Sequence, residues 1–209
     1  MTNKGLNTKQ VGSLFGVDES TVRRWALAGK INCSSSAGGH RSFSYKNIIE
    51  FSRIKEMKIK YQSTSAAINT KKTINKIISL ILNNDSKSIE SILNKLYIKG
   101  IPLSNIMDDY IEKTLVEIQN KLENREISVA EEHIARKIIS KSLNNFRLSI
   151  SNTKNKKIKN ILCLNLENDI PDLPIDMIQI LLEDINYNVD NCGSHTSIRD
   201  LKKLLENKN

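Results

Sequence analysis

The sequence lacks the features that mark secreted, membrane-spanning or disulfide-stabilised proteins. Its three cysteines, Cys33, Cys163 and Cys192, are odd in number and far apart, which excludes a disulfide framework and leaves no pair with metal-ligand spacing. Its apolar runs are only a few residues long, far short of the roughly 20 residues that span a bilayer. Polar residues from Asn3 onward interrupt any apolar leader. We therefore expect a cytoplasmic protein with no membrane partner.

The sequence also lacks a catalytic constellation. Its three histidines lie in three different segments, no serine stands in a nucleophile-elbow context, and no glycine-rich phosphate loop occurs. His195 stands close to Cys192, but no further ligand lies near them in the sequence, so the pair does not indicate a metal site. We expect neither enzymatic activity nor a bound metal.

Positive charge is concentrated at the N-terminal end of the chain. The net charge is +9, but abundant lysine, isoleucine and asparagine are typical of an AT-rich coding bias, so lysine content alone says little. Residues 1–60, however, contain eleven basic and four acidic residues, a balance of +7 that leaves +2 for the rest. A positive field confined to one end favours a nucleic-acid partner there.

Two polar stretches, 62–70 and 149–157, divide the chain into three predicted parts. Residues 1–61 are expected to form a winged helix-turn-helix, residues 70–150 a four-helix bundle, and residues 158–209 a small, partial α/β (Rossmann-like) unit. The expected fold class is therefore mainly α.

The first part is expected to begin with two helices joined by a tight turn. Apolar spacing predicts a helix over Thr8–Phe15, a turn at Gly16, and a second helix that is capped by Asp18 and ends near Gly29. The second helix is expected to bury its apolar residues. It would then leave a polar outer face made of Ser20, Thr21, Arg23 and Arg24.

A hairpin and a third helix complete the first part. The paired glycines before His40 predict a hairpin turn with Arg41 as the charge at its tip, and Ser44 caps a third helix. The second helix is slim enough to enter the major groove of DNA, and arginine can bind guanine or phosphate with a planar fork. The predicted DNA contacts are Thr8, Lys9, Ser20, Thr21, Arg23, Arg24, Lys30, His40, Arg41 and Ser42.

Several spaced motifs of this part resemble the MerR and excisionase-type helix-turn-helix superfamily. They are Leu6-Asn-Thr-Lys-Gln-Val, Gly16-Val17, Ser20-Thr-Val-Arg-Arg-Trp25 and Gly38-Gly-His-Arg41. The similarity covers nearly all of residues 5–56. It implies recognition-helix contacts near Thr21, Arg23 and Arg24, and a contact of Arg41 with the DNA backbone.

The second part shows four runs of apolar residues at three- and four-residue spacing, which predicts a helical bundle. Asn84-Asp85 separates the first run from the second, and Gly100 and Pro102 separate the second from the third. Ser128-Val-Ala-Glu131 is a capping box that opens the fourth helix.

The bundle resembles the helical half of cobalamin-binding modules, which follow a MerR-type head in light-sensing repressors. The segment Ile127-Ser-Val-Ala-Glu-Glu-His133 carries most of this similarity. In that family a Glu-His pair, matching Glu132 and His133, lies near the upper face of the cofactor. A tryptophan ten residues before the Glu covers the same face, and here that position is Leu122.

The third part is expected to contain two β-α units. A buried strand over 158–165, a helix over Asp176–Ile185, a strand over Tyr187–Asp190 and a helix over Ser197–Leu205 are predicted. A two-stranded parallel sheet is marginal by itself, so we expect this unit to pack on the bundle or on another subunit.

The third part also departs from the cobalamin pattern. The family's first strand leads into a motif whose histidine binds cobalt and whose glycine approaches the macrocycle. Here those positions hold Pro171 and Pro174, and proline has no imidazole. We therefore expect no cofactor, with Glu132 and His133 as vestigial candidates only.

These observations predict a transcriptional regulator that binds double-stranded DNA as a homodimer. The bundle and the α/β unit would serve oligomerisation or respond to an unknown small-molecule or protein signal. Two alternatives remain open. One is an excisionase-like accessory protein of recombination, and the other is a functional cobalamin-dependent photoreceptor-type repressor.

Overall fold

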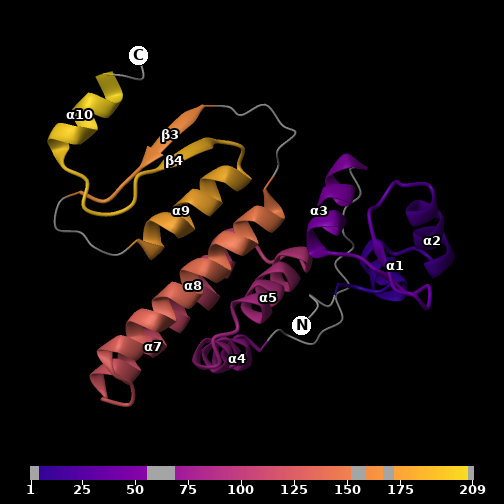
Figure 1. The fold of residues 1–209 in the computed structure, drawn as a ribbon, viewed down its shortest axis with the longest axis horizontal. Helices are drawn as coiled ribbons and strands as arrows, with labels where there is room; N and C mark the ends of the chain where they lie inside the picture. The colour runs from indigo at the N-terminus through magenta and orange to yellow at the C-terminus, as the bar shows by residue number, and fades with distance from the viewer. Residues whose placement is uncertain (1–4, 56–68, 152–158, 167–171, 207–209) are drawn as a thin grey trace.

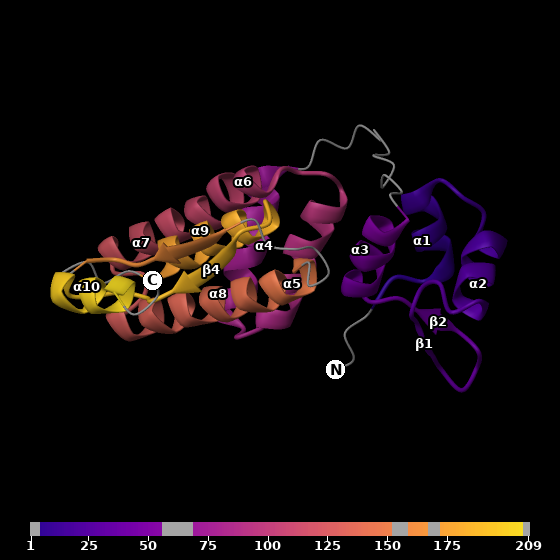
Figure 2. The same ribbon diagram turned by 90° about the horizontal axis from the view of Figure 1, so that it is seen from above.

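A computed structural model describes residues 5–55, 69–151, 159–166 and 172–206 of the chain. The chain is mainly helical, and its described strands form two small two-stranded sheets. Figures 1 and 2 show a head of three helices at one end of the molecule, a bundle in the middle, and helix α10 at the opposite end. The expected fold class is confirmed. The polar stretches that would divide the chain fall largely outside the described residues, so the domain boundaries stay predictions.

The head contains helices α1 (Thr8–Phe15), α2 (Glu19–Leu27) and α3 (Tyr45–Ile54), and a hairpin of β1 (Ser34–Ser35) and β2 (Arg41–Ser42). Helix α1 has the predicted bounds. Its N-cap, Asn7, forms a capping box with Gln10, which the sequence analysis did not identify.

The turn between α1 and α2 depends on two glycines. Gly16 ends α1 in the left-handed conformation, with a φ of 64°, which glycine adopts without steric cost. Gly12 lies beneath the turn, because a Cβ added there would meet the carbonyl oxygen of Val17 at 2.7 Å. The small residue therefore lets the second helix start close to the first.

The ends of α2 and α3 follow the sequence closely, with one difference. Asp18 occupies the predicted N-cap position of α2, but its side chain makes no capping hydrogen bond. At the other end α2 stops at Leu27, and Gly29 follows with a φ of 64°. Ser44 caps α3 as predicted and accepts a hydrogen bond from the amide of Asn47 at 3.2 Å.

The bundle consists of α4 (Thr70–Leu82), α5 (Ser86–Ile98), a third helical rod and α8 (Val129–Ile150). The third rod runs from α6 (Leu103–Asn105) through a π-helical segment (Ile106–Glu112) into α7 (Lys113–Glu123). The four predicted helices are confirmed, and the π-helical segment is an unpredicted feature of the third. Its side chains fill the bundle core together with those of α5 and α8, and the fully buried ones include Leu93, Ile106, Met107, Ile111, Ile139, Leu143 and Phe146.

Local signals at the ends of the bundle helices are also confirmed. Asn84 takes a φ of 57° in the turn after α4, and Asp85 caps α5. The capping box at Ser128 and Glu131 starts α8, with both of its reciprocal hydrogen bonds present.

The α/β unit pairs β3 (Asn160–Cys163) with β4 (Asn188–Asn191) in parallel, with α9 (Leu173–Asp184) as the crossover. Helix α9 begins at Leu173 and not at the predicted Asp176, because Pro174 fits the first turn of a helix, where its missing N–H costs nothing. Pro171 lies outside the described residues.

Helix α9 fastens this unit to α8. Asp176 accepts a hydrogen bond from Ser140 at 3.0 Å, and Arg147 pairs with Glu183 at 2.8 Å. Ile180 of α9 is buried at the same junction. The last helix, α10 (Ile198–Glu206), buries none of its residues. The expected packing of the unit on the bundle is therefore present, and α9 provides it.

Candidate nucleic-acid interface

Helix α2 presents one polar face to solvent because its apolar face is held in the head core. Val22 is fully buried, and Trp25 packs against Phe15 and Phe51, with ring centroids 5.9 and 4.8 Å apart. These contacts fix the rotation of the helix about its axis. As a result Ser20, Arg23 and Arg24 are exposed and Thr21 is half-buried.

Both arginines of this face are bonded within α2. Arg23 pairs with Glu19 at 2.7 Å, and the guanidinium of Arg24 donates to the hydroxyl of Thr21 at 3.0 Å. Exposed pairs of this kind contribute only about 0.2–1 kcal/mol, so a phosphate or a guanine edge can displace them. These contacts hold both side chains along the helix but are weak enough to be exchanged for other partners.

The hairpin carries three further predicted contacts beside α2. Its turn closes where the amide of Gly39 donates to the carbonyl of Ser36 at 2.9 Å, and Gly39 has a φ of 75°. His40 is exposed at this turn. Arg41 and Ser42 form β2 and are half-buried, so Arg41 lies just behind the turn and not at its outermost point. That the hairpin acts as a wing stays a prediction.

The remaining predicted contacts differ in their exposure. Lys9 and Lys30 are exposed, but the side chain of Thr8 is buried, with the residue only 8% exposed at the first position of α1. Thr8 therefore has little side-chain surface to offer DNA. The sequence could not reveal this, because the segment that leads into α1 pairs at Leu6 with the distant residue Phe43.

A polar groove lies between the head and the corner where α4 meets α5. Its volume is about 1040 Å³, and Arg41, Ser42 and Tyr45 line it from the head. Lys87 and Lys95 of α5 line it from the bundle. The structure thus places Arg41 in the lining of the same groove as two basic residues of the bundle, an arrangement that sequence reasoning did not predict.

The two residues that match the cobalamin-contact motif, Glu132 and His133, lie in different surroundings. The side chain of Glu132 is buried and paired with Arg136, whereas that of His133 is 68% exposed, with its Nε2 at 3.7 Å from a Glu132 oxygen. Glu132 therefore links the first turn of α8 to the next turn through its ion pair with Arg136.

A pocket of about 380 Å³ lies at the junction of α8 with α9. Its lining contains no histidine and consists of Lys137, Ser140, Lys141, Asn144, Arg147, Asp176, Gln179 and Ile180. Among the described residues, no group of three or more His, Cys, Asp or Glu could hold a metal ion.

Comparison with protein-family models assigns both helical parts. Residues 6–69 match the model of the MerR HTH family regulatory protein, and residues 73–145 match that of the B12 binding domain. The chain has a MerR-type head followed by a B12-binding-type domain. The MerR-type head places the chain in the general class of DNA-binding regulators.

Other comparisons add little to this assignment. A solved structure, titled as a novel cobalamin-binding protein from Desulfitobacterium hafniense DCB-2, is 12% identical with a TM-score of 0.30. The match covers 64% of this chain and 63% of that one, so the chain spans somewhat less than two thirds of that structure. No curated protein matches the chain. Within the described ranges, none of the helices combines the length and apolar character that crossing a bilayer requires.

Proposed function

We propose that the protein is a sequence-specific transcriptional regulator that binds double-stranded DNA as a dimer through its MerR-type head. The observation that carries this proposal is the outer face of α2. Ser20, Arg23 and Arg24 are exposed along one side of α2, and the apolar side of the same helix packs into the head core. A helix in this setting can enter the major groove, and a dimer would place two such helices at half-sites one turn apart.

The two kinds of contact would have different roles. Arg23 and Arg24 would exchange their intrahelical partners for guanine edges or phosphates, giving sequence preference. Residues of the hairpin and Lys30 would hold the DNA backbone and set the register of α2 in the groove. Each neutralised phosphate releases counterions, so affinity is expected to fall steeply with salt.

We further propose that the B12-binding-type domain works without cobalamin. His133 is exposed and Glu132 is taken up by Arg136, so neither side chain is prepared for a macrocycle. The space between α8 and α9 is small, and Pro171 stands where the family pattern has its cobalt ligand. The domain would serve oligomerisation or respond to another signal.

A double variant tests the DNA site. The variant Arg24→Ala/Arg41→Ala should bind an operator fragment at least tenfold more weakly than the wild type at physiological salt, because one good bidentate contact is worth about 1–3 kcal/mol. Fluorescence anisotropy measures the affinity. Lys137→Ala/Lys141→Ala removes the same charge from exposed positions of α8 and should bind normally. Equal affinity of the arginine variant and the wild type would refute the site.

Two measurements address the alternatives. Genome-wide mapping of bound DNA would show sites at promoters if the protein regulates transcription, and at recombination junctions if it is an excisionase-like accessory. The match to a B12 binding domain keeps cobalamin as a second candidate ligand. A stable red complex after mixing with adenosylcobalamin would overturn the cofactor-free proposal, and light scattering of the free protein tests the dimer.

A further inference from the structure

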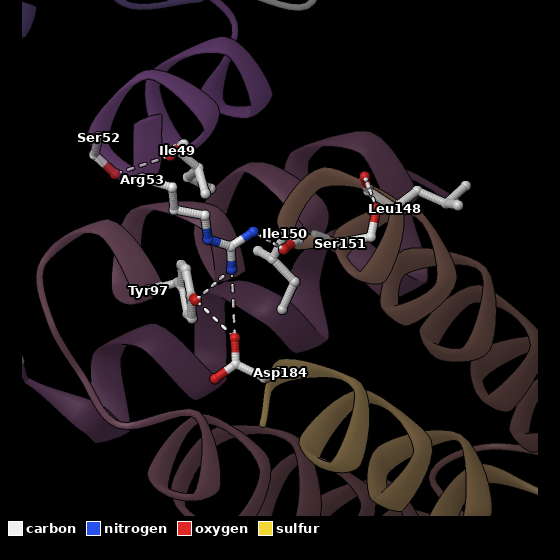
Figure 3. A network of polar contacts seen from close by, with 8 residues as sticks. All are labelled: Ile49, Ser52, Arg53, Tyr97, Leu148, Ile150, Ser151 and Asp184. Carbon is white, nitrogen blue, oxygen red and sulfur yellow. Dashed lines mark hydrogen bonds and ion pairs between the residues drawn. The ribbon is translucent and has the colours of Figure 1, made fainter. Parts of the chain in front are cut away.

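One arginine of the head, Arg53, makes polar contacts with both the bundle and the α/β unit. Arg53 lies in the last turn of α3, and its guanidinium points away from the head, between α5, α8 and α9 (Figure 3). Its Nη1 donates to the carbonyl oxygen of Ile150 at 2.6 Å. Its Nη2 donates to the hydroxyl of Tyr97 at 3.2 Å and lies 3.6 Å from a carboxylate oxygen of Asp184.

The partners of Arg53 are also bonded to one another. The hydroxyl of Tyr97, in α5, donates to the same oxygen of Asp184 at 2.8 Å. Asp184 is the last residue of α9. We call these four residues, Arg53, Tyr97, Ile150 and Asp184, the Arg53 junction. It joins the head to the bundle and to the α/β unit at one point.

The chemistry of the junction suits a planar, permanently charged group. The last carbonyls of a helix have no intrahelical partner and carry the negative end of the helix dipole, and Ile150 ends α8. A guanidinium can satisfy this carbonyl with one nitrogen and the Tyr97–Asp184 pair with another. A lysine would place a single ammonium charge here and could not present two separate nitrogen donors in one plane.

The ion pair of the Arg53 junction is more buried than the surface pair of Arg23 and Glu19. The side chains of Arg53 and Asp184 are 29% and 26% exposed, against 58% and 42% for Arg23 and Glu19. Water screens partly buried charges less than exposed ones. Burial and the neighbouring Asp184 raise the pKa of Tyr97 to about 12, so its hydroxyl stays a donor at physiological pH.

We propose that the Arg53 junction sets the orientation of the head and makes it depend on the position of α9. Asp184 is the one junction residue that comes from the α/β unit, and it contacts both Arg53 and Tyr97, so a ligand or partner that displaces α9 would remove both contacts and loosen the head. This inference rests on the proposed function for its effect on DNA. In a dimer, two heads held at a fixed angle meet their half-sites without a further loss of orientational freedom.

The test measures head orientation and DNA affinity separately in the full-length protein. Cys33, Cys163 and Cys192 are replaced by serine, and spin labels are attached at Lys46→Cys in α3 and Lys141→Cys in α8, both exposed. Pulsed electron resonance then gives the distribution of distances between head and bundle. Arg53→Ala and Asp184→Asn should broaden it, and Arg53→Lys should have an intermediate effect.

Affinity for operator DNA should fall three- to tenfold in Arg53→Ala and Asp184→Asn. Arg199→Ala, which removes an exposed arginine of α10, should match the wild type in both measurements. Asp184→Asn keeps the size of the side chain, so it tests the idea even if Arg53→Ala fails to fold. Unchanged distances in both variants would overturn the junction's role in orientation, and broadened distances with unchanged affinity would overturn its role in binding. If the Arg24→Ala/Arg41→Ala variant bound DNA as tightly as the wild type, the proposed function would fail. The distances between the two spin labels would still test whether the Arg53 junction orients the head.

Discussion

The head and the α/β unit bury their apolar side chains in different ways. In the head, Val11, Val22, Phe43 and Ile48 are all fully buried, and they come from three helices and the hairpin strand region that pack on one another. In the α/β unit the strands β3 and β4 are at most half-buried, and the buried side chains belong to α9. The helices and the hairpin region of the head thus all contribute fully buried side chains, whereas among the described residues of the α/β unit only α9 does so, where it packs on α8. A part attached in this way can shift against the bundle, and Asp184 of the Arg53 junction would pass such a shift on to the head.

The largest expected effect tests the two cores against each other. Phe43→Ala should destabilise the head by about 3–5 kcal/mol, because it deletes a fully buried aromatic ring. Leu162→Ala, in the half-buried strand β3, should cost only about 1 kcal/mol. Urea unfolding followed by circular dichroism measures both. Equal costs would show that the sheet is as well packed as the head.

A smaller effect is expected where the head depends on close backbone approach. Gly12→Ala should cost about 1–3 kcal/mol, because the new Cβ meets the carbonyl of Val17 at 2.7 Å and α2 must shift. DNA affinity should fall with it. Ser13→Ala, at the next and exposed position of α1, provides the control and should be near neutral. A stable Gly12→Ala protein with normal affinity would mean that the turn can adjust freely.

The junction between the two regions should respond to high pH. The pKa of Tyr97 is raised to about 12 in the folded chain, above its ordinary value of 10.0, so its contribution is complete below pH 10 and lost between pH 10 and 12. The loss should reach up to about 2 kcal/mol. Tyr97→Phe cannot ionise and should lack this dependence. Thermal unfolding at pH 8 to 11 measures it, and parallel curves for the two proteins would argue against the raised pKa.

The smallest effect is expected at the far end of the α/β unit. Leu204→Ala in α10 should change the free energy of unfolding by less than about 1 kcal/mol, because α10 buries none of its residues. Ile180→Ala in α9, where the side chain is buried, should cost about 2–5 kcal/mol. A large effect of Leu204→Ala would indicate that α10 packs against another copy of the chain.

Local signals made most of this fold predictable from the sequence. Ser44 and Ser128 mark helix starts with side-chain caps, and Gly16 marks a helix end, because each acts through bonds within a few residues. The start of α9 differs from the predicted Asp176 because Pro174, which stands at the glycine position of the cobalamin pattern, also suits a first helical turn.

Contacts between distant segments were not predictable in this way. Arg53 counted only as one charge among eleven in the first 60 residues, yet it meets a carbonyl 97 positions away. The burial of Thr8 and the placement of Arg41 and Lys95 in one groove likewise depend on how separate parts pack. The predicted DNA contacts on α2 needed only helical periodicity, and their role in binding remains to be measured.

The length of α8 has a mechanical consequence. This helix runs without interruption through 22 residues, which at about 1.5 Å per residue makes a stiff rod roughly 33 Å long. Glu132 sits near one end, the head is attached at the other, and α9 lies along the side. A tilt of about 5° around the first end of such a rod would carry the far end by about 3 Å, the scale of one hydrogen bond. A small change in packing at one end of α8 can therefore displace the head, which is attached at the other end, by a distance of this size.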